Sequence, residues 1–68
     1  METITINTEF IKLDQFLKWI GAVDTGADAK NVIAEGIVKV NGNVEIKRGK
    51  KLRSGDTVEI EGKIFKIG

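Results

Sequence analysis

The side chains that could do chemistry in this sequence are mostly basic, and they are concentrated in one segment. Residues 39–53 hold six basic residues and one acidic residue, a net charge of +5, whereas the rest of the chain holds five basic and nine acidic residues. Lysine and arginine neutralise phosphates and release the counterions condensed on a nucleic acid. We therefore interpret the segment as a nucleic-acid contact; the alternative is a solvated turn that protects a sheet edge. Its basic residues are Lys39, Lys47, Arg48, Lys50, Lys51 and Arg53.

The residue types on which most enzymes and metal sites depend are absent or isolated. The sequence has no Cys and no His, which excludes disulfides, Cys/His zinc sites, thiol nucleophiles and His-based acid–base pairs. Ser54 is the single serine and has no histidine to activate it. None of the ten carboxylates has the spacing of a recognised metal or acid–base site, so we assign them to surface solvation. We expect a protein that is not an enzyme, with no catalytic residues, cofactor or metal ion.

Length and composition indicate one small globular domain over residues 1–68. A chain of 68 residues with 41% hydrophobic and 31% charged residues can bury only a small core. The apolar runs are too short to cross a membrane, and the first residues lack the basic and apolar regions of a secretory signal. We expect a cytoplasmic monomer that does not bind membranes.

Two helices are predicted in the first half of the chain, after an alternating strand at residues 3–6. Thr8 is a favourable N-cap and Gly21 a favourable C-terminal glycine, which predicts the first helix between them. Thr25, with Asp28 three residues later, resembles a capping box, and Gly36 closes the second helix. Helical spacing predicts these inward positions: Leu13, Phe16, Leu17, Ile20, Ala29, Val32 and Ile33.

After Gly36 the hydrophobic period changes from that of a helix to that of a strand. Apolar residues alternate around Asn41-Gly42-Asn43, which predicts a tight hairpin. Turns at 54–56 and 61–62 bound two more strands, at 57–60 and 63–67, although the pairing order of the last three strands stays open. The fold class is α+β: two N-terminal helices packed on a small antiparallel or mixed sheet of short strands.

The second helix has an exposed face that a phosphate backbone could approach. Lys30 and Ala34 lie close together on it, and the free N–H groups at 25–27 could face an anion. The alternative is that alanine is simply a good helix former. Trp19 lies beside the first apolar stripe and either stacks on an unpaired base or packs at the boundary, which we favour. We assign Phe10, Phe16 and Phe65 to the core.

Four segments, in the right order, resemble the RNA-binding domain named after ribosomal small-subunit protein four (the S-four or alpha-L domain). The resemblance extends from Lys12 to Ile60, and the size and basic loop are most similar to the short stand-alone members of the YaaA/YbcJ type. The segments are Lys12-Leu13-Asp14-Gln15-Phe16-Leu17 followed by Gly21, Thr25-x-x-Asp28-Ala29-Lys30-x-x-Ile33-x-x-Gly36, Val38-Lys39-Val40-Asn41-Gly42-Asn43-Val44, and Gly55-Asp56-Thr57-Val58.

This resemblance implies binding to structured RNA, ribosomal or transfer RNA, with a link to ribosome assembly or translation. The partner would be the RNA itself, the ribosome or an assembly intermediate. Gly26 replaces the arginine that follows the family's cap serine, so the 47–53 loop would move the contact toward the sheet. Lys12, Lys30 and Lys39 match the family's basic positions, Thr25 its cap serine and Asn41 its turn. The expected RNA-binding residues are Lys12, Thr25, Gly26, Lys30, Lys39, Asn41, Lys47, Arg48, Lys50, Lys51 and Arg53.

Two other classes of function remain as alternatives. A protein–protein adaptor or assembly factor would use an apolar edge, bind no RNA and be insensitive to salt. A ubiquitin-like sulfur carrier would need an exposed Gly-Gly C-terminus, whereas this chain ends in Lys66-Ile67-Gly68. The helices also precede the hairpin, which argues against the carrier.

Overall fold

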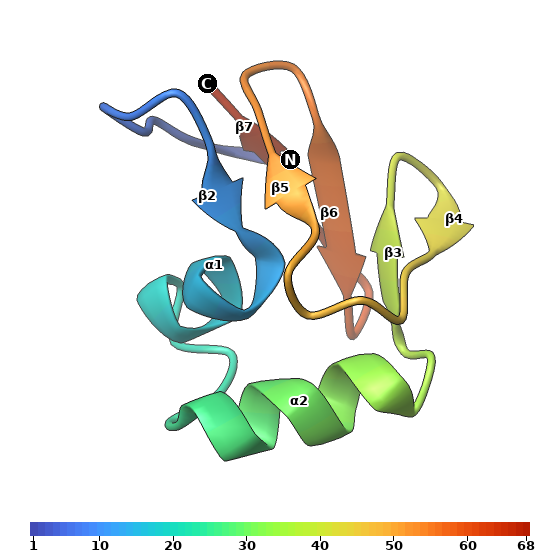
Figure 1. Cartoon of the computed structure of the whole chain (residues 1–68). Coiled ribbons are helices and arrows are strands. Elements are labelled where there is room, and N and C mark those ends of the chain that lie inside the picture. Colours follow the sequence, from blue (N-terminus) through green and yellow to red (C-terminus); the bar gives the residue numbers. More distant parts are fainter.

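Two helices cover one face of a sheet in the computed structural model, which describes residues 1–68 (Figure 1). This arrangement confirms the α+β class, and neither helix has the length and apolar character needed to cross a membrane. The elements are β1 (Glu2–Ile4), β2 (Ile11–Lys12), α1 (Leu13–Trp19), α2 (Gly26–Ala34), β3 (Val38–Val40), β4 (Asn43–Val44), β5 (Lys51–Leu52), β6 (Thr57–Ile60) and β7 (Lys63–Ile67).

The main sheet has five strands in the order β1-β7-β6-β3-β4. Strand β6 lies between β3 and β7 and pairs with both in antiparallel fashion, which determines the pairing order that the sequence left open. Strand β1 pairs with β7 in parallel, so the sheet is mixed. Strands β2 and β5 form a separate antiparallel ribbon beside α1, in which Ile11 is opposite Leu52 and Lys12 is opposite Lys51 (Figure 1).

The predicted start of the first helix at Thr8 is wrong. The Thr8 hydroxyl donates to the carbonyl of Phe10, 2.8 Å away, and the helix begins only at Leu13. Ile11 and Lys12 are extended because they pair with β5, and Lys12 occupies the N-cap position without a side-chain cap. The pairing partner lies far along the chain, so local sequence contains no signal for it.

The other helix ends agree with the sequence. Gly21 has φ +77°, and the N–H groups of Gly21 and Ala22 donate to the carbonyls of Lys18 and Leu17 at 3.1 and 3.0 Å, the bonding pattern of a Schellman motif. The Thr25 hydroxyl accepts the Asp28 N–H at 3.1 Å and so caps α2. The turn between β3 and β4 has positive φ at both central residues, +52° at Asn41 and +84° at Gly42, as a two-residue hairpin requires.

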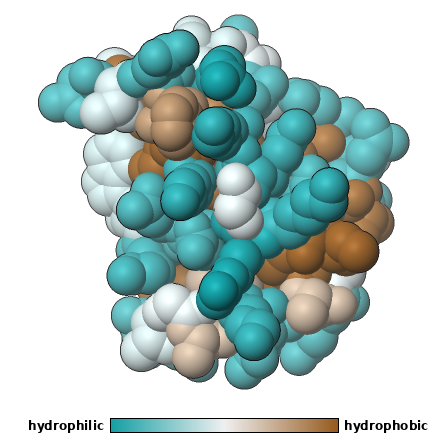
Figure 2. Space-filling model, viewed as in Figure 1, coloured by the Kyte–Doolittle hydropathy of each residue, from teal (hydrophilic) through white to brown (hydrophobic).

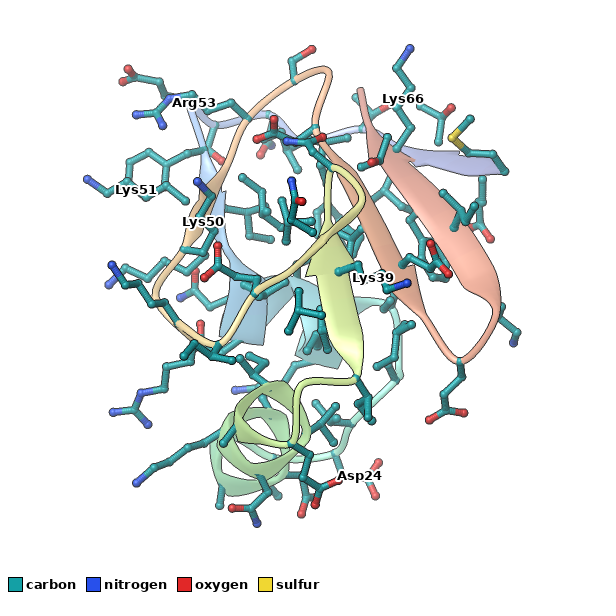
Figure 3. All side chains as sticks on the ribbon, turned by 90° about the vertical axis from the view of Figure 1, so that its right-hand side faces the viewer. Asp24, Lys39, Lys50, Lys51, Arg53 and Lys66 are labelled. Atoms are coloured by element: carbon teal, nitrogen blue, oxygen red, sulfur yellow. The ribbon has the colours of Figure 1, made fainter.

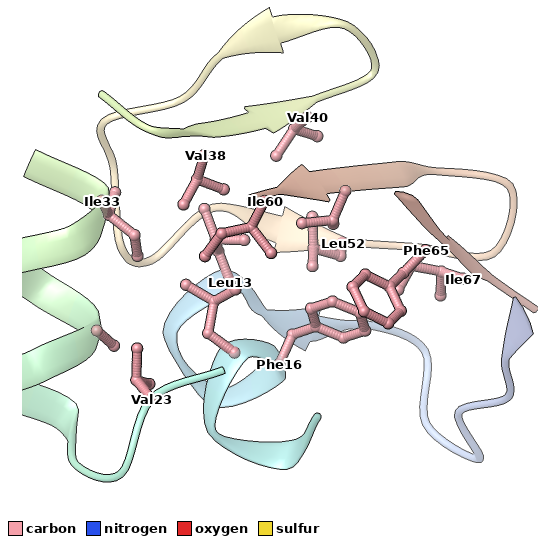
Figure 4. Close-up of a cluster of buried hydrophobic side chains, with 13 residues drawn as sticks. Leu13, Phe16, Val23, Ile33, Val38, Val40, Leu52, Ile60, Phe65 and Ile67 are labelled. Carbon is pink, nitrogen blue, oxygen red and sulfur yellow. The ribbon is translucent and has the colours of Figure 1, made fainter. Parts of the chain in front are cut away.

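A core of thirteen buried apolar residues joins the helices, the sheet and the ribbon (Figure 4). Phe16 of α1 meets Phe65 of β7 edge to face, with ring centroids 6.0 Å apart. Leu52 brings β5 into this core, although its neighbours in the sequence are charged. Phe10 was assigned to the core from the sequence, and that assignment is wrong: its ring is only half-buried and lies outside the cluster.

Replacing Phe16 by alanine should remove most of the stability of the fold. The ring is fully buried at the junction of α1 and β7, so Phe16→Ala should lower the free energy of unfolding by about 3–5 kcal/mol. Urea unfolding followed by the fluorescence of Trp19, the single tryptophan, measures this. Gln15→Ala, at the exposed neighbouring position, should change it by no more than about 0.5 kcal/mol. An unchanged urea midpoint for Phe16→Ala would contradict the described core.

Candidate nucleic-acid interface

The ribbon and the loop before β5 present a group of exposed cations that we call the basic surface. The loop crosses the front of the molecule above α2 in Figure 1, and Figure 3 shows Lys50, Lys51 and Arg53 together on one side. All members are exposed, so their charges are available to a partner. The basic surface consists of Lys12, Lys47, Arg48, Lys50, Lys51 and Arg53.

The backbone of the basic surface is held by the first turn of α1. The Leu13 N–H donates to the Lys50 carbonyl at 2.8 Å, and the Asp14 N–H donates to the Arg48 carbonyl at 3.0 Å. These bonds satisfy two of the N–H groups that every helix start leaves without intrahelical partners. The same loop therefore caps α1 with its carbonyls and exposes its charged side chains.

Strand alternation separates the structural and the charged residues of the ribbon. Ile11 and Leu52 face the core, whereas Lys12 and Lys51 lie directly opposite one another on the exposed side. Like charges at directly opposed positions destabilise a strand pair. The fold tolerates this repulsion at the ribbon, and an anionic partner bound there would relieve it.

Phe10 is the residue on this surface that sequence reasoning missed. The Lys51 ammonium lies 4.9 Å from the centroid of the Phe10 ring, and the Arg53 guanidinium carbon lies 5.7 Å from it. Both distances are within the range of a cation–π interaction. Only the pairing of β2 with β5 brings Phe10 near Arg53, so composition and spacing held no signal for it.

Asn41 joins the β3–β4 turn to the turn before β6. Its side-chain carbonyl accepts the Thr57 N–H at 2.9 Å, and its amide donates to the Asp56 carboxylate at 3.1 Å. The other oxygen of Asp56 accepts the Arg53 N–H at 2.8 Å. Asn41 was predicted as a binding residue; its side chain is engaged within the protein, where it supports the end of the basic surface.

The pKa of the Asp56 carboxyl lies below its ordinary value of 3.8. Partial burial by itself raises the pKa. The hydrogen bonds from the Arg53 N–H and the Asn41 amide, together with the charges of Lys50 and Arg53, lower the pKa by more than burial raises it. The carboxylate therefore stays ionised beside the basic surface and holds the backbone at Arg53.

The start of α2 carries other predicted residues and has a different electrostatic character. Thr25 and Gly26 are exposed, but the Thr25 hydroxyl already accepts the Asp28 N–H, and Asp24 and Asp28 flank the helix start. Figure 3 shows Asp24 on the α2 side of the molecule, away from Lys50, Lys51 and Arg53. Lys30 is exposed together with Ala27, Asn31 and Ala34, as the helical spacing predicted.

Lys39 belongs to the outer face of the main sheet. It lies opposite Val44 on β4 and opposite Glu59 on β6. Figure 3 shows its side chain pointing away from Lys50 and Lys51. The sequence placed Lys39 in one basic segment with the loop, whereas the structure separates it from the basic surface.

Trp19 lies at the end of α1 that is remote from the basic surface. Its side chain is 56% exposed, more than boundary packing predicted. It lines an open cleft of about 610 Å³ with Ile20, Phe65, Glu2 and Lys63 among the other lining residues. The lining of the cleft carries charges of both signs and includes no member of the basic surface.

Comparison with known proteins agrees with the resemblance identified in the sequence. The family model described as S4 domain matches residues 4–68. The chain belongs to the S4 domain family. This S4 domain is 48% identical over 59 residues to the probable ribosome maturation protein RlbA of Bacillus subtilis (strain 168), covering 87% of this chain and 83% of that protein. It is 44% identical over 52 residues to the putative RNA-binding protein YbcJ of Escherichia coli (strain K12), covering 76% of this chain and 74% of YbcJ.

The fold of this S4 domain is also similar to that of a solved relative. The solution structure of YbcJ from E. coli matches it with a TM-score of 0.72 and 37% sequence identity, covering 98% of this chain and 86% of that one. That structure is described as revealing an alfaL motif involved in RNA-binding. The recognition of the short YbcJ-like type from the sequence is thereby confirmed.

Replacing Asn41 by glycine should show how much the side-chain hydrogen bonds of Asn41 contribute to the stability of this S4 domain, apart from the conformation of the turn. Glycine keeps the positive φ but removes the bonds to Thr57 and Asp56, so Asn41→Gly should lower the free energy of unfolding by about 1–2 kcal/mol. Urea unfolding measures the change, with Asn31→Ala on the exposed face of α2 as the control. A midpoint for Asn41→Gly equal to that of the control would show that these bonds contribute nothing.

Asp56 should contribute stability only while it is ionised. Because its folded pKa is lowered, its contribution is present above the unfolded value of 3.8 and is lost as the pH falls through the folded value. The difference in Tm between the wild type and Asp56→Asn should therefore be constant near neutral pH and shrink below about pH 4. Thermal unfolding from pH 7 to pH 3 measures it. A difference that does not change over this range would contradict the assigned role.

Proposed function

We propose that this S4 domain is a non-catalytic RNA-binding module for structured ribosomal or transfer RNA. The observation that carries the proposal is the basic surface, in which an ordered backbone holds exposed cations together. Its cations contact backbone phosphates, which position a protein on RNA without reading its sequence. Selectivity then comes mainly from the shape of the folded RNA.

The individual residues have different roles in this proposal. Lys12 and the cations from Lys47 to Arg53 make the phosphate contacts, and Lys30 adds a contact from the exposed face of α2. Asn41 maintains the geometry near Arg53 through its bonds to Thr57 and Asp56. Thr25 and Gly26 set the start of α2, and Lys39 contacts only RNA that reaches around the β3–β4 hairpin.

The cellular role that we propose is in ribosome assembly or translation, in the cytoplasm. This part of the proposal is supported by the similarity to a protein named for probable ribosome maturation, which is 48% identical over 87% of this chain. A ribosome or an assembly intermediate presents a dense array of phosphates in folded RNA, which suits recognition by charge and shape.

An adaptor that binds protein is the second candidate function. Ile37, Val44 and Ile46 are 44%, 54% and 66% exposed. Figure 2 shows hydrophobic surface on the right-hand side over the β3–β4 hairpin, next to hydrophilic side chains of the loop. Exposed apolar patches mark interaction sites. Binding to a protein partner that does not weaken with salt would favour this function over RNA binding.

RNA binding should be saturable and strongly dependent on salt. If about four to six phosphates are engaged, log affinity should fall with log salt with a slope of about −3 to −5. Reversing the charge of two exposed lysines, in Lys50→Glu/Lys51→Glu, should weaken binding by about 100-fold for different structured RNAs alike. Titration of a fluorescent ribosomal RNA hairpin at about 50 and 200 mM salt measures both effects.

The matched control reverses two lysines of β7, in Lys63→Glu/Lys66→Glu. Both residues are exposed, and the change in net charge is the same. Figure 3 shows Lys66 on the other side of the molecule from Lys51. The control should bind the RNA hairpin much more tightly than Lys50→Glu/Lys51→Glu does. Equal losses in the two variants would mean that only net charge matters, and no binding by the wild type at low salt would contradict the proposed function.

A further inference from the structure

Phe10 lies outside the core and beneath two cations of the basic surface. The Lys51 ammonium is 4.9 Å from the ring centroid, and the Arg53 guanidinium carbon is 5.7 Å from it. The ring is half-buried, while both cations are exposed. A single aromatic side chain therefore contacts two of the six members of the basic surface.

The register of the ribbon explains this arrangement. Lys12 is opposite Lys51, and Ile11 is opposite Leu52 in the core. Phe10 directly precedes β2 and Arg53 directly follows β5. Alternate residues of an extended chain share a face, so these two residues continue the exposed side of the ribbon beyond Lys12 and Lys51. Phe10 is the one uncharged member of this group of four.

An aromatic ring can order cations without cancelling their charge. A carboxylate at this position would also attract Lys51 and Arg53, but it would neutralise part of the positive potential that binds phosphate. The ring attracts both cations through its negative face and leaves their net charge unchanged. It also restricts long side chains that would otherwise lose rotamer freedom on binding.

We propose that Phe10 is a positioning residue for phosphate binding, which holds Lys51 and Arg53 in place on the exposed side of the β2–β5 ribbon. Backbone phosphates of the RNA then meet two cations that are already ordered. This inference rests on the proposed RNA-binding function and adds to it a specific subsite at the ribbon, built by an apolar residue that has no direct contact with phosphate.

The first test replaces the ring by an aliphatic side chain of similar size. Phe10→Leu should weaken binding of a structured RNA hairpin by about fivefold at low salt. The slope of log affinity against log salt should not change, because the number of cations is the same. Phe10→Tyr keeps the ring and should retain the wild-type affinity. Trp19→Leu, which removes an exposed aromatic at the other end of α1, should also have no effect.

The second test asks whether Phe10 acts through the two cations. In a Lys51→Gln/Arg53→Gln background, Phe10→Leu should change the affinity by less than about 1.5-fold, because there is no longer a charge to position. An equal loss in both backgrounds would overturn the proposal and would indicate direct contact with RNA, such as stacking of an unpaired base on Phe10. Wild-type affinity in Phe10→Leu would overturn it as well.

Measurements on the free protein keep the inference testable without RNA. The side-chain protons of Lys51 should show upfield ring-current shifts in NMR spectra, and these shifts should disappear in Phe10→Leu. The Tm of each variant shows whether the fold is intact. Unshifted Lys51 protons in the wild type would overturn the proposal. Absence of saturable RNA binding by the wild type would instead contradict the proposed function, so the two failures are distinguishable.

Discussion

The structure depends on two backbone hydrogen bonds between the start of α1 and the loop before β5. The N–H groups of Leu13 and Asp14 donate to the carbonyls of Lys50 and Arg48, and β2 pairs with β5 directly alongside. Together these bonds determine where α1 begins, and they give a strongly basic loop an ordered backbone. Without them the helix start would lack partners and the loop would be an unsupported, self-repelling chain.

The same few residues stabilise the fold and present the charge. In β5, Lys51 faces solvent while Leu52 is fully buried in the core that contains Phe16 and Phe65. Burial of Leu52 anchors the ribbon and offsets the repulsion between Lys51 and Lys12. A change on either side of the ribbon therefore affects both stability and the position of the cations, which is why matched control variants are needed to separate the two.

The hydrogen bonds of Asn41 and Asp56 support the far end of the basic surface. They connect the β3–β4 turn with the backbone of Arg53, and the ionised Asp56 lies near the charges of Lys50 and Arg53. The centre of the proposed RNA contact thus lies at the ribbon and its loop. The acidic residues Asp24 and Asp28 flank the start of α2 at Gly26, so this end of the helix is less favourable to an anion than the ribbon.

The sequence by itself determined the features that depend on neighbours along the chain. The cap at Thr25, the end of α1 at Gly21, the Asn41-Gly42 turn and the excess of positive charge all follow from residues a few positions apart. Motif resemblance identified the family and selected Lys12, whereas the density of basic residues along the chain selected the rest of the basic surface. Tertiary structure alone decided the pairing of β2 with β5, the start of α1 at Leu13, the place of Phe10 under two cations and the separation of Lys39 from them. These features arise from backbone bonds and packing between distant segments, and such contacts leave no periodic or local signal in either segment.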